Sequence, residues 1–361
     1  MIKQVLFSLV TISLLLSACL KTPTPAYPPA TSQPKEPQTL TVMTHDSFAV
    51  SESLITTFET QNNVKITFVK AGDAGSAVNR LILTAASGSA SADVFYGIDN
   101  TFLSRALDQN LFEIYQSPAL KNVPSEFQLD SSHRVTPIDY GDVCINYDKQ
   151  YFVDEGLPLP ASLVQLQDPT FYELLVVENP ATSSPGLAFV MTTVAAFGED
   201  GWLDWWAAMK ENGVVIVSDW ETAYYTNFSG SSGRGPQPMV VSYASSPAAE
   251  LIYSDPKLEQ APTGSLVGDN MCWRQIEFAG ILKGTQNRSI AEKFIDFLLS
   301  QAFQEDMPLQ MFVYPVLNGA ALPEDFVKAS ESPMKAAALD PQLIAQKRDV
   351  WVQAWSDLML K

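Results

Sequence analysis

The amino-acid sequence predicts an α/β fold in which helices flank largely parallel sheets. Short apolar runs alternate with segments of helical periodicity along most of the chain, and no internal repeat is visible. Several apolar runs also end abruptly in polar residues, as in LTVMTHDSF (40–48). In sheets of this kind ligands bind beyond the carboxyl ends of the strands, so these polar ends are candidate parts of a site.

Each expected element follows from its local pattern. Apolar runs of about four to six residues, bounded by polar or turn residues, are typical of buried strands: Leu40–Met43, Val64–Val69, Ala92–Tyr96, Val143–Tyr147, Leu174–Val177, Val214–Val217 and Met239–Tyr243. Apolar residues three and four apart indicate helices: Ser51–Gln61, Ala77–Ser87, Thr101–Gln109, Leu187–Phe197, Trp202–Glu211, Pro247–Tyr253, Ile290–Ser300 and Gln342–Leu360. A stripe within 291–304 predicts one late, core-facing helix there: Phe294, Phe297, Leu298 and Gln301.

The N-terminal residues predict export. Lys3 precedes an apolar run from Val5 to Leu16 that is short for a membrane span, and Leu-Ser-Ala comes before Cys19. Residues 1–18 are therefore expected to be a signal peptide. The motif resembles a bacterial lipobox, which implies cleavage before Cys19 and a lipid on its thiol; the alternative is an ordinary signal peptide with a chance cysteine. Residues 19–38, rich in Pro, Thr and Ser, are expected to form a tether.

The charge of the chain limits its partners. Lys and Arg number 22 against 40 Asp and Glu, which gives a formal net charge of −18 and a pI near 4.4. Such a surface repels nucleic-acid phosphates, so nucleic acid is not an expected partner. It attracts small cations, although acidity of this kind also simply keeps an exported protein in solution.

Two cysteines, Cys144 and Cys272, remain beside Cys19. Outside the cytoplasm two cysteines often pair, so we expect a disulfide between them; the alternative is two buried free thiols. The sequence contains no Ser-His-Asp pattern, metal-ligand cluster or nucleotide-binding loop. No catalytic residue, metal or cofactor is therefore expected.

Nine segments, in consistent order over nearly all of the expected folded region, resemble one family. They are LTVMTHDSF (40–48), AVNRLI (77–82), ADVFYGIDN (92–100), PIDYGDVCINYDK (137–149), ATSSPGLAF (181–189), SDWETAYY (218–225), VVSYASSPA (240–248), QAFQEDMP (301–308) and MFVYPV (311–316). The set is similar to the thiamine-binding branch of the solute-binding proteins of bacterial ABC transporters.

This resemblance implies the two-lobed, type II periplasmic-binding-protein fold. Each lobe would be a mixed sheet flanked by helices, with a ligand cleft between the lobes. Lobe 1 would comprise 39–140 plus about 271–308, and lobe 2 about 141–270 plus 309–361. The resemblance also implies a monomeric, non-enzymatic receptor, lipid-anchored at the outer face of the cell membrane or in the periplasm, that delivers thiamine, its phosphates or a pyrimidine precursor to a permease.

Three other functions stay open at this point. Adjacent tyrosines, Tyr224 and Tyr225, are similar to those that ferric-ion receptors use, and a polyamine receptor belongs to the same class. A thiaminase-like enzyme can share the fold, but it needs a nucleophilic cysteine in the cleft, and Cys144 and Cys272 stand at structural positions.

Thiamine carries a permanent thiazolium cation, which aromatic faces and carboxylates can bind. The candidate ligand-binding residues lie in the matching segments: His45, Asp46, Ser47, Asp73, Ser183, Ser184, Trp220, Tyr224, Tyr243, Phe312 and Tyr314. The hydroxyls of Ser183 and Ser184 precede an expected helix, where they suit either a phosphate or simple N-capping.

Three positions depart from the family pattern. His45 stands where a tyrosine is usual, Ala249 where a second aromatic residue is frequent, and Phe312 where a tryptophan is frequent. The aromatic cage is therefore expected to be thinner. If His45 stacks on a cationic ligand, binding should weaken below about pH 6, because the imidazole becomes charged.

Overall fold

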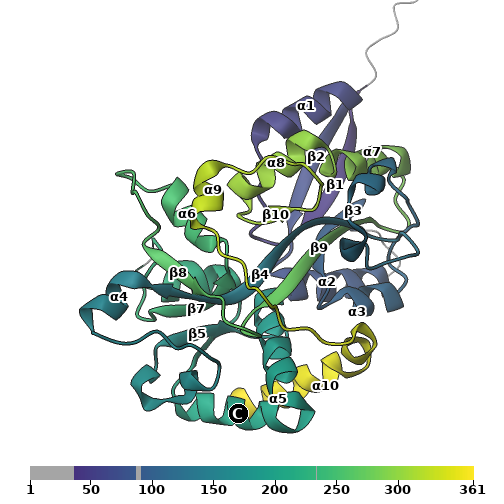
Figure 1. Cartoon of the computed structure of the whole chain (residues 1–361). Helices are drawn as coiled ribbons and strands as arrows, with labels where there is room; N and C mark the ends of the chain where they lie inside the picture. Colours follow the sequence, from purple (N-terminus) through teal and green to yellow (C-terminus); the bar gives the residue numbers. More distant parts are fainter. Residues whose placement is uncertain (1–35, 87–90, 233) are drawn as a thin grey trace, which may run out of the picture. The chain divides into compact units, whose positions relative to one another are not determined.

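The computed structural model describes residues 36–86, 91–232 and 234–361 (Figure 1). The expected signal peptide, Cys19 and nearly all of the expected tether lie outside these ranges, so they stay predictions. Within the described ranges, no helix has both the length and the apolar character to cross a membrane.

The first part of the sheet is a parallel block around β1 (Gln38–Thr44). β1 lies between β2 (Val64–Lys70) and β3 (Val94–Asp99) and pairs with both in parallel. Two helices make the connections, α1 (Glu52–Asn62) and α2 (Ala74–Ala86). Because β1 is central, its apolar run is buried on both faces, as the uninterrupted pattern predicts.

Two antiparallel strands join this block to the second one. β4 (Thr136–Asp148) pairs with β9 (Trp273–Ile281) along its first half, and from Val143 onward its neighbours are β7 (Met239–Tyr243) and β8 (Thr263–Leu266). Both long strands run through the centre of the molecule in Figure 1. The sheet order is β2-β1-β3-β9-β4-β7-β5-β6, with β8 and β10 also paired to β4.

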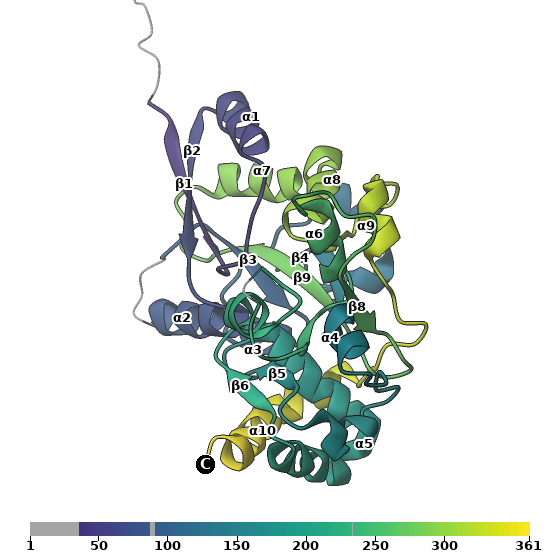
Figure 2. The ribbon, with the colours of Figure 1, turned by 90° about the vertical axis from the view of Figure 1, so that its left-hand side faces the viewer.

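The second parallel block is built around β5 (Leu175–Glu178), which lies between β7 and β6 (Val215–Val217). The long helix α5 (Ser184–Glu211) follows β5 and is kinked at Gly198, whose φ is 73°. The two helices expected over 187–211 are therefore the two arms of α5. Figure 2 shows α1 and α7 at one end and α5 and α10 at the other, with β4 and β9 between them.

The remaining elements include one correction. The single helix expected over 291–304 is wrong: α7 (Arg288–Leu298) ends, and Ser300 caps a new helix, α8 (Gln301–Gln310), by accepting a hydrogen bond from Phe303 N. The other elements are α3 (Leu103–Asp108), α4 (Lys149–Asp154), α6 (Ser246–Ile252), α9 (Glu324–Ala329), α10 (Pro341–Met359), β10 (Tyr314–Pro315), the π-helical turn Thr222–Asn227, and the 3₁₀ turns Pro118–Asn122, Ser125–Phe127, Gln165–Gln167 and Pro169–Phe171.

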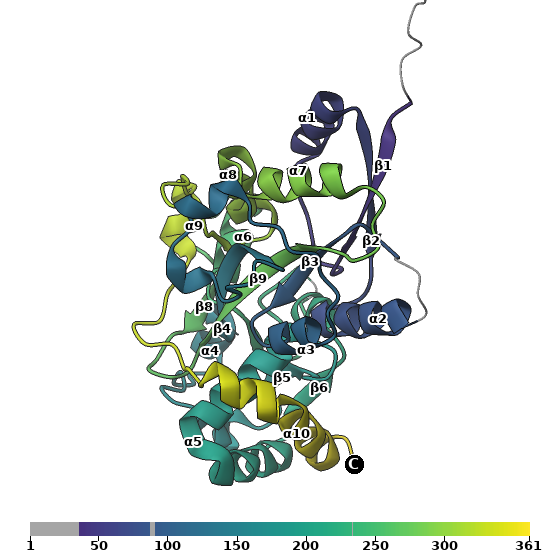
Figure 3. The same cartoon turned by 90° about the vertical axis from the view of Figure 1, so that its right-hand side faces the viewer.

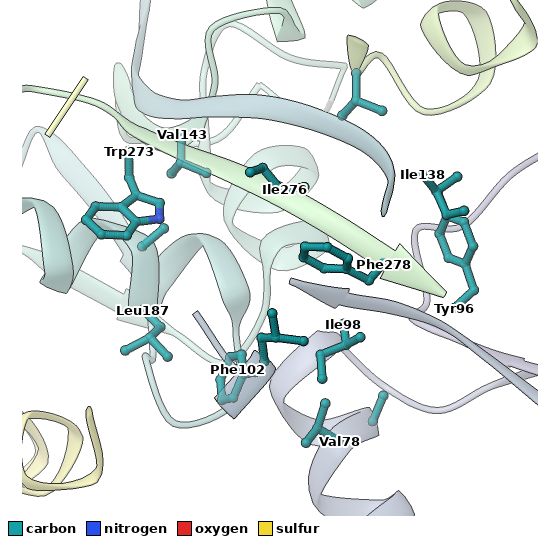
Figure 4. Packing of buried hydrophobic residues seen from close by; sticks show 14 of the residues in the cluster. Val78, Tyr96, Ile98, Phe102, Ile138, Val143, Leu187, Trp273, Ile276 and Phe278 are labelled. Carbon is teal, nitrogen blue, oxygen red and sulfur yellow. The ribbon is translucent and has the colours of Figure 1, made fainter. Parts of the chain in front are cut away.

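One hydrophobic cluster continues through both blocks. Figure 4 shows Phe278 of β9 near Ile98 of β3, and Ile276 of β9 and Leu187 of α5 belong to the same cluster. At the far end, α10 packs on α5, where the rings of Trp206 and Trp355 meet edge to face at 5.5 Å (Figure 3). The core therefore crosses the joining strands, and the expected lobe boundaries stay a prediction.

The expected disulfide is confirmed. Cys144 of β4 is bonded to Cys272, the residue before β9, and both are fully buried. The bond ties together the two long strands where the chain enters and leaves the second block.

Candidate functional site

A cavity of about 230 Å³ lies where strand ends and helix N-termini from both blocks meet. One water needs roughly 10–15 Å³ of such space, so the cavity has room for a small molecule. Its lining residues come from segments far apart in sequence: His45, Ser47, Ala49, Asp73, Ala74, Asp139, Gly141, Ser184, Pro185, Trp220, Glu221, Tyr224, Tyr225, Tyr243, Ser246, Ala249, Gln275, Glu277, Gln310, Met311, Phe312 and Val313.

The floor of the cavity is a four-residue patch on the two joining strands. Asp139 pairs with Glu277 across the β4/β9 ladder, and Gly141 pairs with Gln275. Because residues two apart on a strand share a face, and cross-strand partners do too, all four lie on one face. The sheet register thus brings an acidic pair and an amide together beneath the cavity.

His45 lies against this floor. Its Nε2 is 3.3 Å from Glu277 Oε1, and both side chains are buried. Burial lowers the pKa of His45, but the charge and hydrogen bonding of Glu277 together with the charges of Asp73 and Asp139 outweigh that effect, so the pKa is raised above its usual value. Gly97 of β3 makes room for the ring, because a Cβ there would lie 2.4 Å from His45 Cδ2; Gly97 also has a φ of +104°.

Asp139 is buried and shares the floor with Glu277. The Tyr96 hydroxyl donates a hydrogen bond to Asp139 Oδ2. Burial and the charge of Glu277 raise the pKa of Asp139 well above its usual value. Two carboxyl groups this close do not both ionise readily. The protonated form of Asp139 is therefore favoured beside Glu277.

Three aromatic rings form one wall. Trp220 stacks on Tyr224 with centroids 5.0 Å apart, and Tyr225 meets both rings edge-on. The Trp220 indole is fixed in its plane, because Nε1 donates to Ser242 Oγ at 2.9 Å. A ring held in this way offers a fixed π-face at the cavity.

Tyr243 and Gln275 form a hydrogen-bonded pair at the end of β7. Gln275 Nε2 donates to the Tyr243 hydroxyl at 2.9 Å, whereas Gln275 Oε1 is buried and has no hydrogen-bond partner among the described residues. The Tyr243 ring fits here because Gly141 has no side chain; a Cβ there would lie 2.7 Å from Tyr243 Cδ1.

Asp73 connects the two blocks. It precedes α2, and its carboxylate accepts hydrogen bonds from the backbone N–H groups of Ala74 at 2.6 Å and Trp220 at 3.1 Å. Burial raises the pKa of Asp73, although a hydrogen bond from Ser183 and the two N–H groups oppose the rise. Ser184, the first residue of α5, lines the cavity with a buried hydroxyl that has no partner among the described residues.

Phe312 completes the rim in an uncommon backbone conformation. Its φ is +55°, which is unfavourable for a bulky side chain. Phe312 N donates to Met307 O at 3.1 Å, and its carbonyl accepts a hydrogen bond from Ser245 Oγ. These contacts at both ends of the residue hold it in place.

The cavity is acidic. Four carboxyl groups line it, from Asp73, Asp139, Glu221 and Glu277; with Asp139 protonated, three remain against the single imidazole of His45. None of the described lining residues is a lysine or an arginine. Such a lining favours a small cation over an anion.

The structure brings together eight of the eleven residues that the sequence analysis selected: His45, Ser47, Asp73, Ser184, Trp220, Tyr224, Tyr243 and Phe312. Asp46, Ser183 and Tyr314 are not lining residues. Asp46 accepts a hydrogen bond from Gly72 N, Ser183 caps α5, and Tyr314 stacks on Tyr140. Ligand contact by any of the eleven stays a prediction.

The strand β9, and with it Gln275 and Glu277, was not predicted from the sequence. Asp139 and Glu221 were not among the residues selected from the sequence. A signal for the missed strand was present, since Gln275 and Glu277 alternate with apolar residues in WRQIEFAG (273–280). That spacing is typical of a strand with one polar face.

Comparisons with known proteins agree with this architecture. The "Thiamine-binding periplasmic protein" of Escherichia coli K12 is 29% identical over 321 residues, covering 88% of this chain and 92% of that protein. A solved "Periplasmic thiamin binding protein" has a TM-score of 0.77 and 26% identity, covering 90% of this chain and 96% of the other. The "Iron uptake protein A1" of a Synechocystis strain is 23% identical over 343 residues, covering 92% and 90%.

These similarities confirm the predicted fold class, an α/β type II periplasmic-binding-protein fold with a ligand cleft between two lobes. The model of the family described as "Bacterial extracellular solute-binding protein" matches residues 89–340. This match spans well over half of the chain, and the protein therefore belongs to the family of bacterial extracellular solute-binding proteins.

Proposed function

We propose that this protein is an extracytoplasmic receptor that captures thiamine, a thiamine phosphate or a pyrimidine precursor and delivers it to an ABC transporter permease. The observation that carries the proposal is the lining of the cavity: four carboxyl groups and the Trp220 face, with no lysine or arginine among the described lining residues. A permanent organic cation needs such carboxylates and π-faces. The relatives named for thiamine binding support the same ligand class.

A ferric-ion receptor is the second candidate, because one relative is named for iron uptake. Iron binding would require phenolate oxygens from Tyr224 and Tyr225. Tyr224, however, is buried beneath Trp220, and burial raises its pKa well above the usual value. In the protein without iron the phenolate form is therefore disfavoured, and the Tyr224 ring is stacked on Trp220, an arrangement that favours an organic cation over iron.

The other two alternatives differ from thiamine in a feature that the cavity can distinguish. A polyamine is cationic but has no aromatic ring to stack on Trp220. A thiaminase-like enzyme needs a cysteine thiolate, and Cys144 and Cys272 are joined in a buried disulfide. We therefore propose that the receptor is not an enzyme. We also propose that it is monomeric, that it is exported, and that a lipid on Cys19, after the lipobox-like motif, holds it at the membrane.

Calorimetric titration of the purified protein tests the ligand. We expect thiamine to bind, and spermidine and ferric citrate to bind weakly or not at all. Trp220→Ala should weaken thiamine binding by a factor of about 2–30, the equivalent of roughly 0.5–2 kcal/mol for a cation–π contact. Tyr172→Ala, an exposed aromatic residue that does not line the cavity, is the matched control and should change nothing.

Two results would contradict this function. Tight spermidine binding together with no thiamine binding would make the protein a polyamine receptor. A visible phenolate-to-iron absorption band on addition of ferric citrate, lost in Tyr224→Phe, would make it an iron receptor. Native mass spectrometry of freshly purified protein adds an independent readout of any ligand retained.

A further inference from the structure

The floor of the cavity presents a buried hydrogen-bond acceptor that has no partner among the described residues. Gln275 is 3% exposed, and its Oε1 makes no hydrogen bond with the described residues. In the structure Nε2 donates to the Tyr243 hydroxyl at 2.9 Å, which leaves Oε1 as the unpaired atom of the amide. An unpaired buried acceptor is unfavourable, so a ligand that supplies an N–H or O–H donor at this point is stabilised.

A second acceptor lies beside it. Glu277 is two residues further along β9, so its carboxylate shares the face of Gln275 and also lines the cavity. His45 Nε2, 3.3 Å from Glu277 Oε1, fixes one side of this carboxylate and partly balances its charge. The floor therefore combines two acceptors, one neutral and one charged, held by His45, which directly follows β1, and by residues of β7 and β9.

We propose that Gln275 Oε1 and the Glu277 carboxylate accept hydrogen bonds from an amino group on an aromatic ring of the ligand and thereby select amino-substituted heterocycles over their oxo counterparts. The inference rests on the proposed function, in which the ligand carries an aminopyrimidine. An exocyclic amino group has two N–H donors, which matches two acceptors. An oxo group at the same position is itself an acceptor and is rejected by both residues.

The part of the cavity that suits the cation is the wall formed by Trp220 and Glu221, not the floor. The Trp220 π-face and the exposed Glu221 carboxylate come from the segment after β6, not from the strands of the floor. A ligand with a cationic ring and an aminopyrimidine ring can therefore use both surfaces at once. This division predicts that substitutions in the floor change how strongly the protein prefers an amino-substituted ring. A substitution at Glu221 should change only the attraction of the cation.

Titration of the wild-type protein with thiamine and with oxythiamine tests the inference. The two compounds carry the same thiazolium cation and differ on the pyrimidine ring, where oxythiamine has an oxo group in place of the amino group and carries a proton on a ring nitrogen. We expect oxythiamine to bind at least about ten-fold more weakly, since a charge-assisted hydrogen bond is lost and an acceptor meets acceptors. This comparison needs no variant and so does not depend on how a substituted protein folds.

Two variants and a control locate the effect. Glu277→Gln and Gln275→Leu should weaken thiamine binding by about ten-fold or more and bring the thiamine-to-oxythiamine affinity ratio toward one. Glu221→Gln removes a charge from the same cavity, so it should weaken both compounds equally and leave the ratio unchanged. Equal or tighter wild-type binding of oxythiamine overturns the inference while leaving the proposed function intact. The proposed function itself is overturned if the protein binds neither of these compounds, nor a thiamine phosphate, nor a pyrimidine precursor.

Discussion

The Cys144–Cys272 disulfide should contribute measurably to the stability of the folded region. The bond closes a loop with a sequence separation of 128 residues, which contains β5 to β8 and α4 to α6. We consider the double variant Cys144→Ala/Cys272→Ala, which opens this loop in the unfolded state. The unfolded chain then gains conformational freedom that the disulfide had removed.

The magnitude follows from the length of the loop. In the chain-entropy treatment a loop of this length is worth about 5 kcal/mol at 25 °C, and native disulfides typically contribute about 2–5 kcal/mol. The compact unit spans residues 37–361. At an unfolding entropy of about 2.1 cal/mol/K per residue, a chain of that size loses roughly 3–7 °C of Tm for this change.

Differential scanning calorimetry of the oxidised wild type and the double variant measures the shift. Wild-type protein reduced before the scan is the matched control, because it opens the loop without removing the two sulfur atoms from the core. Two outcomes would refute the reasoning: alkylation of both thiols in unfolded protein that was never reduced, or an unchanged Tm in both the variant and the reduced wild type.

Two further predictions concern His45, the histidine that lies against the floor. His45→Gln should destabilise the protein mainly at acidic pH, because the pKa of His45 is raised in the folded state. The stability that comes from its pairing with Glu277 is fully present below the unfolded pKa of 6.5, and it is lost as the pH rises through the folded pKa. Denaturant titrations of wild type and variant from about pH 5.5 to 9 measure the difference, and a constant gap would contradict the pairing. Gly97→Ala should lower stability by roughly 1–3 kcal/mol and weaken ligand binding, because its φ of +104° disfavours a side chain and the new Cβ would displace the His45 ring. Thermal unfolding and calorimetric titration check both effects. The matched control is Gly201→Ala, where the added Cβ would lie 3.6 Å from Phe197 Cβ. If Gly97→Ala bound the ligand as tightly as the wild type, the expected displacement of His45 would be contradicted.

Local patterns predicted most of the helices and the strands of the two parallel blocks. The apolar run 40–43 became the buried centre of β1, and its polar end, with His45 and Ser47, does reach the cavity. The same rules failed at 291–304, where helical periodicity continues through Leu299 and Ser300 although the chain starts a new helix there. Periodicity records which face is buried but does not record a change in the direction of the axis.

The chemistry of the floor could not be predicted from local patterns in the same way. Glu277 and Gln275 interrupt an apolar run, so their segment was not recognised as a strand, and their pairing with Asp139 and Gly141 is set by the register between β4 and β9. That register depends on packing across more than a hundred intervening residues, to which no local signal extends. The partner of His45, and therefore the direction of its pKa shift, depends on the same pairing.

The amino-acid sequence alone was thus sufficient for the α/β class, the polar strand ends, the acidic character that favours a cation, and the cysteine pair that forms the disulfide. These properties depend on composition, on short-range periodicity and on the expected compartment. The fold decided which of the selected residues line one cavity, because Asp73, Trp220 and Tyr243 meet there only through contacts between distant segments. It also decided that the residues beneath them are Gln275, Glu277 and Asp139, because hydrogen bonds between long strands fix which side chains share a face.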